Sequence, residues 1–356
     1  MSLIIDLENI RKNIKLIKEI TKKELMVVQK SNAYELNSQK IIPLLKEEKI
    51  KWIVYNKYIE YLKDKEILDG FNILIMESVT LKNTKLPVTH TINNLDDALL
   101  ISEINHKIKV HLQVDTGMNR IGIRSLEEAN KIISILSKNS NIIIEGIYTH
   151  FSSNDNEYEY YNKQVSKFKE YLKLYPFKII HSAATPSLTK EITGNMVRVG
   201  MAIYGYGNHN LDLHPSISFR VPVINSFKVK DKDFVGYNQK FKVTTPGYIS
   251  VIPLGYDDII GISELTKNST RYSIVGKVCM NHLFIFSKHK INNLTKLNVL
   301  SKNDIISYEK YDWYLIITSM KKIPKNYLRR SNYDLPKVFN RTNQAYQKYQ
   351  FRKRSN

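Results

Sequence analysis

The chain has 356 residues, which is enough for two domains that each bury a hydrophobic core. Hydrophobic residues make up 42% and charged residues 25%, an ordinary globular balance, and no apolar run reaches the roughly 18 residues of a membrane helix. Cys279 is the single cysteine, so the chain has no internal disulfide, and residues 1–6 lack the features of a signal peptide. We therefore expect a cytoplasmic protein without a membrane partner.

The first part of the chain alternates short apolar runs with helical periods. A strand at 2–6 and a helix at 7–20 open the chain. Eight further strands are predicted at 25–28, 52–55, 72–76, 88–91, 108–114, 142–148, 178–180 and 196–199. Helices are predicted between most of them, at 38–48, 94–104, 125–137 and 157–175. Eight strands that alternate with helices predict a parallel (β/α)8 TIM-type barrel over 7–207.

The pattern changes after Gly207. Runs of β type then dominate, at 216–223, 227–230, 247–253 and 273–279. They predict a mostly antiparallel β domain over 208–325, to which the strand at 2–6 is assigned. The expected fold class is therefore α/β plus all-β, followed by a basic tail at 326–356 without a clear apolar period.

The basic residues outnumber the acidic residues by 54 to 34, which gives a net charge of +20. Lysines before residue 325 are dispersed and are read as solvated surface rather than as a polyanion site. The tail at 326–356 places aromatic residues among basic ones, a pattern that can bind nucleic acid by stacking. Packing of these side chains on the protein itself is the favoured reading, since such motifs produce many false matches.

Polar residues follow several predicted barrel strands, at the end where barrel enzymes place their active sites. They are Lys30, Arg120, His150, Thr185 and Arg198. A lysine at a strand end can form a Schiff base with an aldehyde cofactor, and an arginine can bind a carboxylate. Enzymes that act on amino acids with pyridoxal 5'-phosphate (PLP) require both a Schiff-base lysine and a carboxylate-binding group. Thr185 and the backbone N–H groups of 200–201 suit the phosphate of such a cofactor.

Seven motifs resemble those of bacterial alanine racemases, and they occur in the order found in that family. They are QKSNAY at 29–34, DTGMNRIG at 115–122, GIYTHF at 146–151, NMVRVGMAIYG at 195–205, VGY at 235–237, IPLGY at 252–256 and VGKVCM at 275–280. The resemblance implies a PLP-dependent racemase of alanine that supplies D-alanine for the cell wall. It also implies a homodimer with shared active sites.

The resemblance implies a role for each matching residue. Lys30 holds PLP and acts as one base, and Tyr237 from the partner subunit acts as the second base on the opposite face. His150 and Arg198 assist Tyr237, and Arg198 also faces the pyridine nitrogen of the cofactor. The residues implied in phosphate binding are Tyr34, Thr185, Gly200, Met201 and Tyr314. Those implied in substrate binding are Arg120 and Met280, which orient the carboxylate, and Tyr256, which lines the entrance.

The sequence departs from the family pattern around these residues. The family Gly-His-Gly is here Glu35-Leu36-Asn37, and Ala184 and Asn281 replace an asparagine and an aspartate. Gln113 replaces a lysine, often carboxylated, that supports the arginine, and we expect Gln113 to orient Arg120 by a neutral hydrogen bond. Such changes affect rate or specificity more than the reaction itself. A racemase for other amino acids and a catalytically weakened PLP-binding protein are therefore the alternatives.

Other PLP proteins are also weighed. Decarboxylases and D-amino-acid aldolases on this type of barrel resemble the chain less, because decarboxylases place an acid, not an arginine such as Arg198, at the pyridine nitrogen. Single-domain PLP carriers lack a β domain that would supply Tyr237. Both comparisons favour the racemase.

Overall fold

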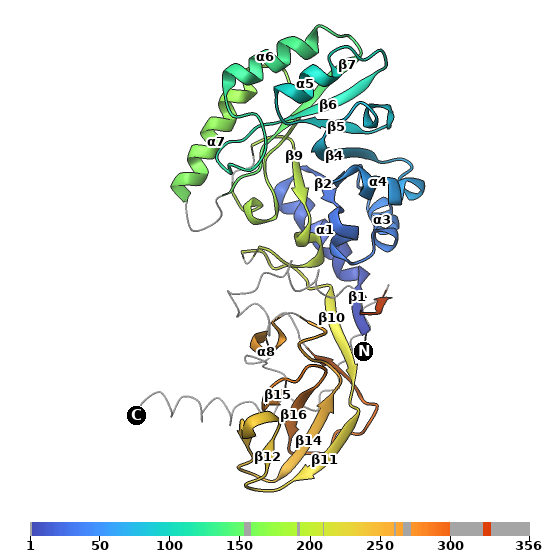
Figure 1. Ribbon diagram of the computed structural model, residues 1–356, viewed down its shortest axis with the longest axis vertical. Helices are drawn as coiled ribbons and strands as arrows, with labels where there is room; N and C mark the ends of the chain where they lie inside the picture. Colours follow the sequence, from blue (N-terminus) through green and yellow to red (C-terminus); the bar gives the residue numbers. More distant parts are fainter. Residues whose placement is uncertain are drawn as a thin grey trace. The chain divides into compact units, whose positions relative to one another are not determined.

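A computed structural model describes residues 2–152, 158–190, 193–208, 210–259, 261–265, 272–299 and 323–328. The chain forms two compact units (Figure 1). One comprises Asn9–Pro215, and the other joins Met1–Glu8 to Ser216–Asn356. Tyr314 and the tail beyond residue 328 lie outside the described residues, so the predictions made for them stay predictions.

The first unit is built on a closed barrel of eight parallel strands (Figure 1). The strands are β2 (Glu24–Val28), β3 (Trp52–Tyr55), β4 (Asn72–Ser78), β5 (Thr89–Ile92), β6 (Ile108–Gln113), β7 (Ile142–Tyr148), β8 (Ile179–His181) and β9 (Met196–Val199). The first strand pairs with the last, with Val27 opposite Val199, and this pairing closes the barrel. The predicted parallel barrel is confirmed.

Helices follow most barrel strands. They are α1 (Leu7–Thr21), α2 (Lys30–Tyr34), α3 (Ser38–Glu47), α4 (Tyr58–Asp64), α5 (Leu95–Ile101), α6 (Leu126–Ser137) and α7 (Tyr158–Leu172). Side chains cap two of them, since Asn94 accepts from the backbone of Asp97 and Ser125 from that of Glu128. Within the described part of the chain, every helix is too short or too polar to cross a membrane.

The barrel interior is apolar in one part and polar in another. Met26, Trp52, Val54, Leu74 and Met196 form a buried apolar cluster on strands β2, β3, β4 and β9. The Trp52 ring lies 5.8 Å from the ring of His111 on β6, a strand that is not its neighbour, so both rings point into the barrel. The polar part contains buried His111, Gln113, Tyr148, His181 and Arg198. An unusually polar core therefore lies within the barrel.

The second unit is made mostly of antiparallel sheets, as predicted. Strands β17 (Lys296–Val299), β10 (Ile217–Pro222), β1 (Ser2–Asp6) and β18 (Lys325–Leu328) form one sheet, and β11 (Asn225–Val229), β14 (Gly247–Ile252), β16 (Leu283–Ser287) and β15 (Ser273–Val275) form another. A short pair, β12 (Phe234–Val235) and β13 (Phe241–Lys242), η5 (Tyr237–Gln239) and α8 (Ile262–Leu265) complete the elements.

One boundary prediction is wrong. Residues 326–328, placed in the basic tail, belong to β18, which pairs in parallel with β1. A strand of four residues is too short to show a hydrophobic alternation, and its place in the sheet comes from the pairing of Ile4 with Asn326 and its neighbours.

Candidate active site

Lys30 stands at the carboxyl end of β2, where it opens a left-handed turn. Residues 31–35 all have positive φ, from 51° at Ser31 to 64° at Glu35. Left-handed backbone costs an L-residue about 1–2 kcal/mol, and such strain gathers at functional sites. The turn brings the Tyr34 ring close to Lys30, whose Nζ lies 5.6 Å from the ring centroid. We call residues 30–37 the Lys30 turn.

The Tyr34 hydroxyl lies against the backbone of Gly200. A Cβ atom added to Gly200 would stand 1.9 Å from the Tyr34 oxygen, so only glycine fits there. Gly200 precedes the one-turn helix η4 (Met201–Tyr204), and Thr185 begins a second one, η3 (Thr185–Ser187). The Ala202 N–H points at Thr185 Oγ1 over 3.4 Å. The Tyr34 and Thr185 hydroxyls thus lie beside the start of η4, where hydroxyl and backbone N–H groups together can bind a phosphate.

Arg198 on β9 is buried and bound almost entirely by carbonyl oxygens and a histidine. One terminal nitrogen donates to the His181 carbonyl at 2.7 Å and to His181 Nδ1 at 2.6 Å. The other donates to the Thr149 carbonyl at 2.6 Å. The guanidinium carbon lies 5.1 Å from the centroid of the Tyr148 ring. Burial lowers the pKa of Arg198 to about 10, which still leaves the group charged at neutral pH.

A row of neutral imidazoles leads away from Arg198. Arginine can only donate, so His181 Nδ1 must accept, and His181 Nε2 must carry the hydrogen. That nitrogen lies 2.9 Å from His111 Nδ1, and His111 Nε2 in turn faces Glu145 at 3.6 Å. Burial lowers the pKa of both histidines, which keeps them neutral. Burial alone would raise the pKa of Glu145, but His111 and Lys109 lower it to about 2.

His150 follows β7 and lines a cavity of about 180 Å³ together with Met118, Ser182 and Ala184. Burial, together with the smaller effects of the charges of Arg198, Arg120 and Lys30, lowers its pKa to about 3. His150 is therefore neutral at physiological pH. Because their charges act on His150, the predicted site residues Lys30, Arg120 and Arg198 lie near it.

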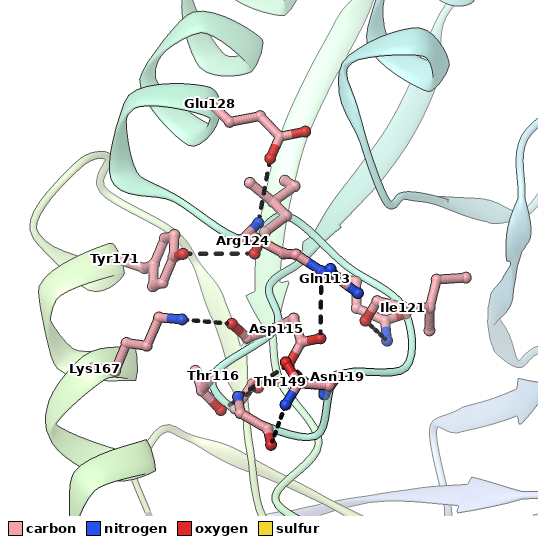
Figure 2. A network of polar contacts seen from close by, with 12 residues as sticks. Gln113, Asp115, Thr116, Asn119, Ile121, Arg124, Glu128, Thr149, Lys167 and Tyr171 are labelled. Atoms are coloured by element: carbon pink, nitrogen blue, oxygen red, sulfur yellow. Dashed lines mark hydrogen bonds and ion pairs between the residues drawn. The ribbon is translucent and has the colours of Figure 1, made fainter.

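Arg120 is exposed on the loop that follows β6, residues 115–124, which we call the Arg120 loop (Figure 2). Asp115 Oδ1 accepts from the N–H groups of Gly117 at 2.9 Å and Asn119 at 3.1 Å. Lys167 on α7 donates to the Asp115 carbonyl at 3.1 Å. The carboxylate that opens the loop thus fixes the course of the backbone that presents Arg120.

The predicted hydrogen bond from Gln113 to Arg120 is wrong. Gln113 is buried and accepts from the Tyr148 hydroxyl at 2.6 Å. Its amide donates to the Ile121 carbonyl at 3.2 Å (Figure 2). The Gln113 amide therefore bonds the backbone of the Arg120 loop and not the Arg120 side chain, although both residues line one hollow with His150. The sequence analysis gave no site role to His111, Tyr148 or His181, although Tyr148 and His181 stand at or next to predicted strand ends.

The remaining predicted residues that the structure describes belong to the second unit, and their side chains are exposed. Tyr237 begins η5 with 65% of its surface accessible, and Tyr256 and Met280 each expose 53%. Backbone hydrogen bonds join Tyr256 N to the Cys279 carbonyl and Asp257 N to the Met280 carbonyl. The structure therefore brings Tyr256 and Met280 together on adjoining segments.

Comparison with known proteins agrees with this geometry. The family described as "Alanine racemase, N-terminal domain" matches residues 5–208, and "Alanine racemase, C-terminal domain" matches residues 216–336. The alanine racemase of Fusobacterium nucleatum is 31% identical over 314 residues, which cover 82% of this chain and 88% of that protein.

Two solved structures share the fold. An alanine racemase from Bartonella henselae with covalently bound pyridoxal phosphate has a TM-score of 0.77 at 22% identity, covering 92% of this chain and 99% of that one. A histidine racemase from Leuconostoc mesenteroides has a TM-score of 0.76 at 22% identity, covering 92% and 97%. The chain therefore belongs to the alanine racemase family and is an amino-acid racemase.

Proposed function

We propose that this protein binds PLP and interconverts L-alanine and D-alanine. The observation that carries the proposal is Lys30 on a strained turn, beside a Tyr34 hydroxyl packed against the backbone of Gly200. This pair of features fits a cofactor with one aldehyde and one phosphate. When bound, PLP withdraws electrons from the amino acid and so makes its Cα proton acidic.

The chain's own residues move the proton. Lys30 holds the cofactor, and its Nζ takes or returns the Cα proton on one face. The hydroxyl of Tyr237 of the partner subunit does the same on the other face, because inversion requires one base on each side. Neutral His150 can accept a hydrogen bond from a donor at the site, which suits a group that assists the tyrosine.

Other residues bind and orient. Arg198 would face the pyridine nitrogen of bound PLP and leave it unprotonated, because the guanidinium stays charged and its N–H groups already donate to His181 and to the Thr149 carbonyl. The proposed phosphate ligands are Tyr34, Thr185, Tyr314 and the N–H groups of Gly200 and Met201. Arg120 and Met280 orient the carboxylate of the substrate, and Tyr256 lines the entrance.

We also propose a twofold homodimer. The exposure of Tyr237, Tyr256 and Met280 leaves these side chains available to another chain, as a shared active site requires. The cytoplasmic location, the supply of D-alanine to the cell wall and nucleic-acid binding by the tail stay predictions from the sequence.

The second candidate is racemisation of a different amino acid. The histidine racemase from Leuconostoc mesenteroides has the same fold, so the fold alone does not select alanine. Ala184 lines the cavity beside His150 in place of the family asparagine, which changes the polarity of that wall.

Proton NMR in D2O tests the proposal. Purified protein with PLP and L-alanine should replace the Cα proton by deuterium and produce D-alanine. Tyr237→Phe should still bind PLP but racemise at least about 100-fold more slowly, as expected for the loss of a base. Exchange of the Cα proton of another amino acid, but not of alanine, would refute alanine as the substrate. A protein that binds PLP and exchanges no amino acid would be the weakened binder.

A further inference from the structure

The Lys30 turn adopts a backbone that its own residues disfavour. Ser31, Asn32, Ala33, Tyr34 and Glu35 carry no feature, apart from Asn32, that eases a positive φ. Backbone hydrogen bonds within the turn, such as Glu35 N to the Ser31 carbonyl at 2.8 Å, offset part of this cost, and contacts from elsewhere add support next to Lys30.

Glu60 on α4 binds the turn next to Lys30. Its Oε1 accepts from the Ser31 N–H at 2.7 Å, and its Oε2 accepts from the N–H groups of Asn56 at 3.1 Å and Lys57 at 3.0 Å. A single carboxylate thus joins the residue after Lys30 to the segment between β3 and α4. Hydrogen bonds to an ionised group are stronger than those between neutral groups.

Asp64 lies one helical turn later on α4 and binds the turn at a second point. It is buried, and its two oxygens accept from the Tyr55 hydroxyl at 2.9 Å and the Ser38 hydroxyl at 2.8 Å. The Ser38 N–H in turn donates to Asn32 Oδ1 at 2.9 Å. Asn32 in the middle of the turn is therefore linked through Ser38 to α4.

Helix α4 is itself anchored to the barrel. The Tyr58 N–H donates to Glu77 on β4 at 2.8 Å, and the Tyr58 hydroxyl lies 2.8 Å from His90 Nδ1 on β5. The start of the helix is thus fixed to two strands, while Glu60 and Asp64, four residues apart, face the turn.

We propose that Glu60 and Asp64 are positioning residues for Lys30. By holding the left-handed turn against α4, they keep Nζ where it can react with an aldehyde and later reach a proton. What Lys30 does there rests on the proposed function, but the support of the turn by α4 does not.

The test compares Glu60→Ala and Glu60→Gln with the parent. Glu66→Ala serves as the matched control, since Glu66 is an exposed carboxylate on the next turn, η1 (Lys65–Ile67). Hydrogen exchange of residues 29–37, read by mass spectrometry without cofactor, should be faster in Glu60→Ala. Covalent attachment of PLP to Lys30, trapped with borohydride, should be about tenfold slower, because the charged acceptor is lost. Glu60→Gln should recover part of both, since it keeps one acceptor oxygen.

Unchanged hydrogen exchange in Glu60→Ala would overturn the proposal. Faster exchange with unchanged PLP attachment would also overturn it, because α4 would then have only a structural role. Asp64→Asn, checked for folding by thermal unfolding, should slow attachment in the same direction. If the parent attaches PLP and Glu60→Ala slows attachment, but neither racemises any amino acid, the proposed function alone fails. If the parent racemises alanine and Glu60→Ala matches it in every readout, the inference alone fails.

Discussion

The Lys30 turn and the Arg120 loop both follow barrel strands and both present a cationic side chain, yet they are held in different ways. In the Arg120 loop the carboxylate of Asp115 accepts from N–H groups two and four residues later, within the loop itself. In the Lys30 turn the carboxylate that accepts from Ser31 comes from Glu60, on another helix. The carboxylate that holds the loop is thus its own, whereas the carboxylate that holds the turn is supplied by α4.

Backbone conformation shows the same difference. Positive φ in the Arg120 loop occurs at Gly117, Asn119 and Gly122, residue types that adopt it at little cost. In the Lys30 turn it falls on residues such as Ala33 and Tyr34, which do not. The residue types of the loop therefore suit its backbone conformation, whereas most residue types of the turn do not.

The largest effect is expected from Lys30→Ala. The variant should lose covalent PLP and racemise at least about 10⁴-fold more slowly, because both the attachment point and one base are removed. Lys40→Ala, which changes an exposed lysine on α3, should behave like the parent. Mass spectrometry after borohydride reduction and NMR racemisation rates provide the readouts. Retention of covalent PLP on the Lys30→Ala variant would place the cofactor on another lysine.

A moderate effect is expected from Asp115→Ala. The variant loses the two hydrogen bonds that the Asp115 carboxylate accepts from backbone N–H groups. This loss should loosen the Arg120 loop and raise KM for the amino acid about tenfold, with a smaller change in kcat. Covalent PLP on Lys30 should be unaffected, because Glu60 and Asp64 still hold that turn. Steady-state kinetics and borohydride trapping test both statements. A matching loss of PLP attachment would mean that the two segments are not independent.

The smallest effect is expected from His90, which contacts Tyr58 at the start of α4. Burial lowers the pKa of His90 to about 4, from an ordinary value near 6.5. At a pH between these two pKa values, His90 is protonated in the unfolded chain but not in the folded protein. The free energy of unfolding therefore falls as the pH drops through this range. His90→Gln, which can still bond Tyr58, should remove about 2 kcal/mol of that dependence. Urea unfolding from pH 7 to 4.5 would show it, and identical pH profiles for the two proteins would contradict the lowered pKa.

Much of the fold followed from patterns that depend on many residues at once. The barrel strands were predicted to within about two residues because each is a compact apolar run between helical periods. The strands β12, β13, β16, β17 and β18 were missed, since short strands in half-exposed sheets leave a weak alternation.

The candidate site was only partly predictable. Lys30 and Arg198 could be found because both stand at strand ends, where a charged side chain is informative. Glu60 and Asp64 could not, because α4 has seven residues and its carboxylates look like solvated surface. The left-handed turn also left no signal, since its residue types do not favour a positive φ and part of its support comes from Glu60, which is distant in sequence.

The two neutral histidines behind Arg198 are dipoles that point in the same direction inside the barrel. Each neutral imidazole turns its unprotonated nitrogen toward Arg198 and its N–H toward Glu145, so the two dipoles are aligned. Each end of the row therefore faces a charge of opposite sign to its own. The positive charge of Arg198 is thus partly balanced from a distance, although among the described residues no carboxylate touches it. The Glu145 carboxylate thus stabilises the charge of Arg198 through two uncharged imidazole rings in the core of the barrel.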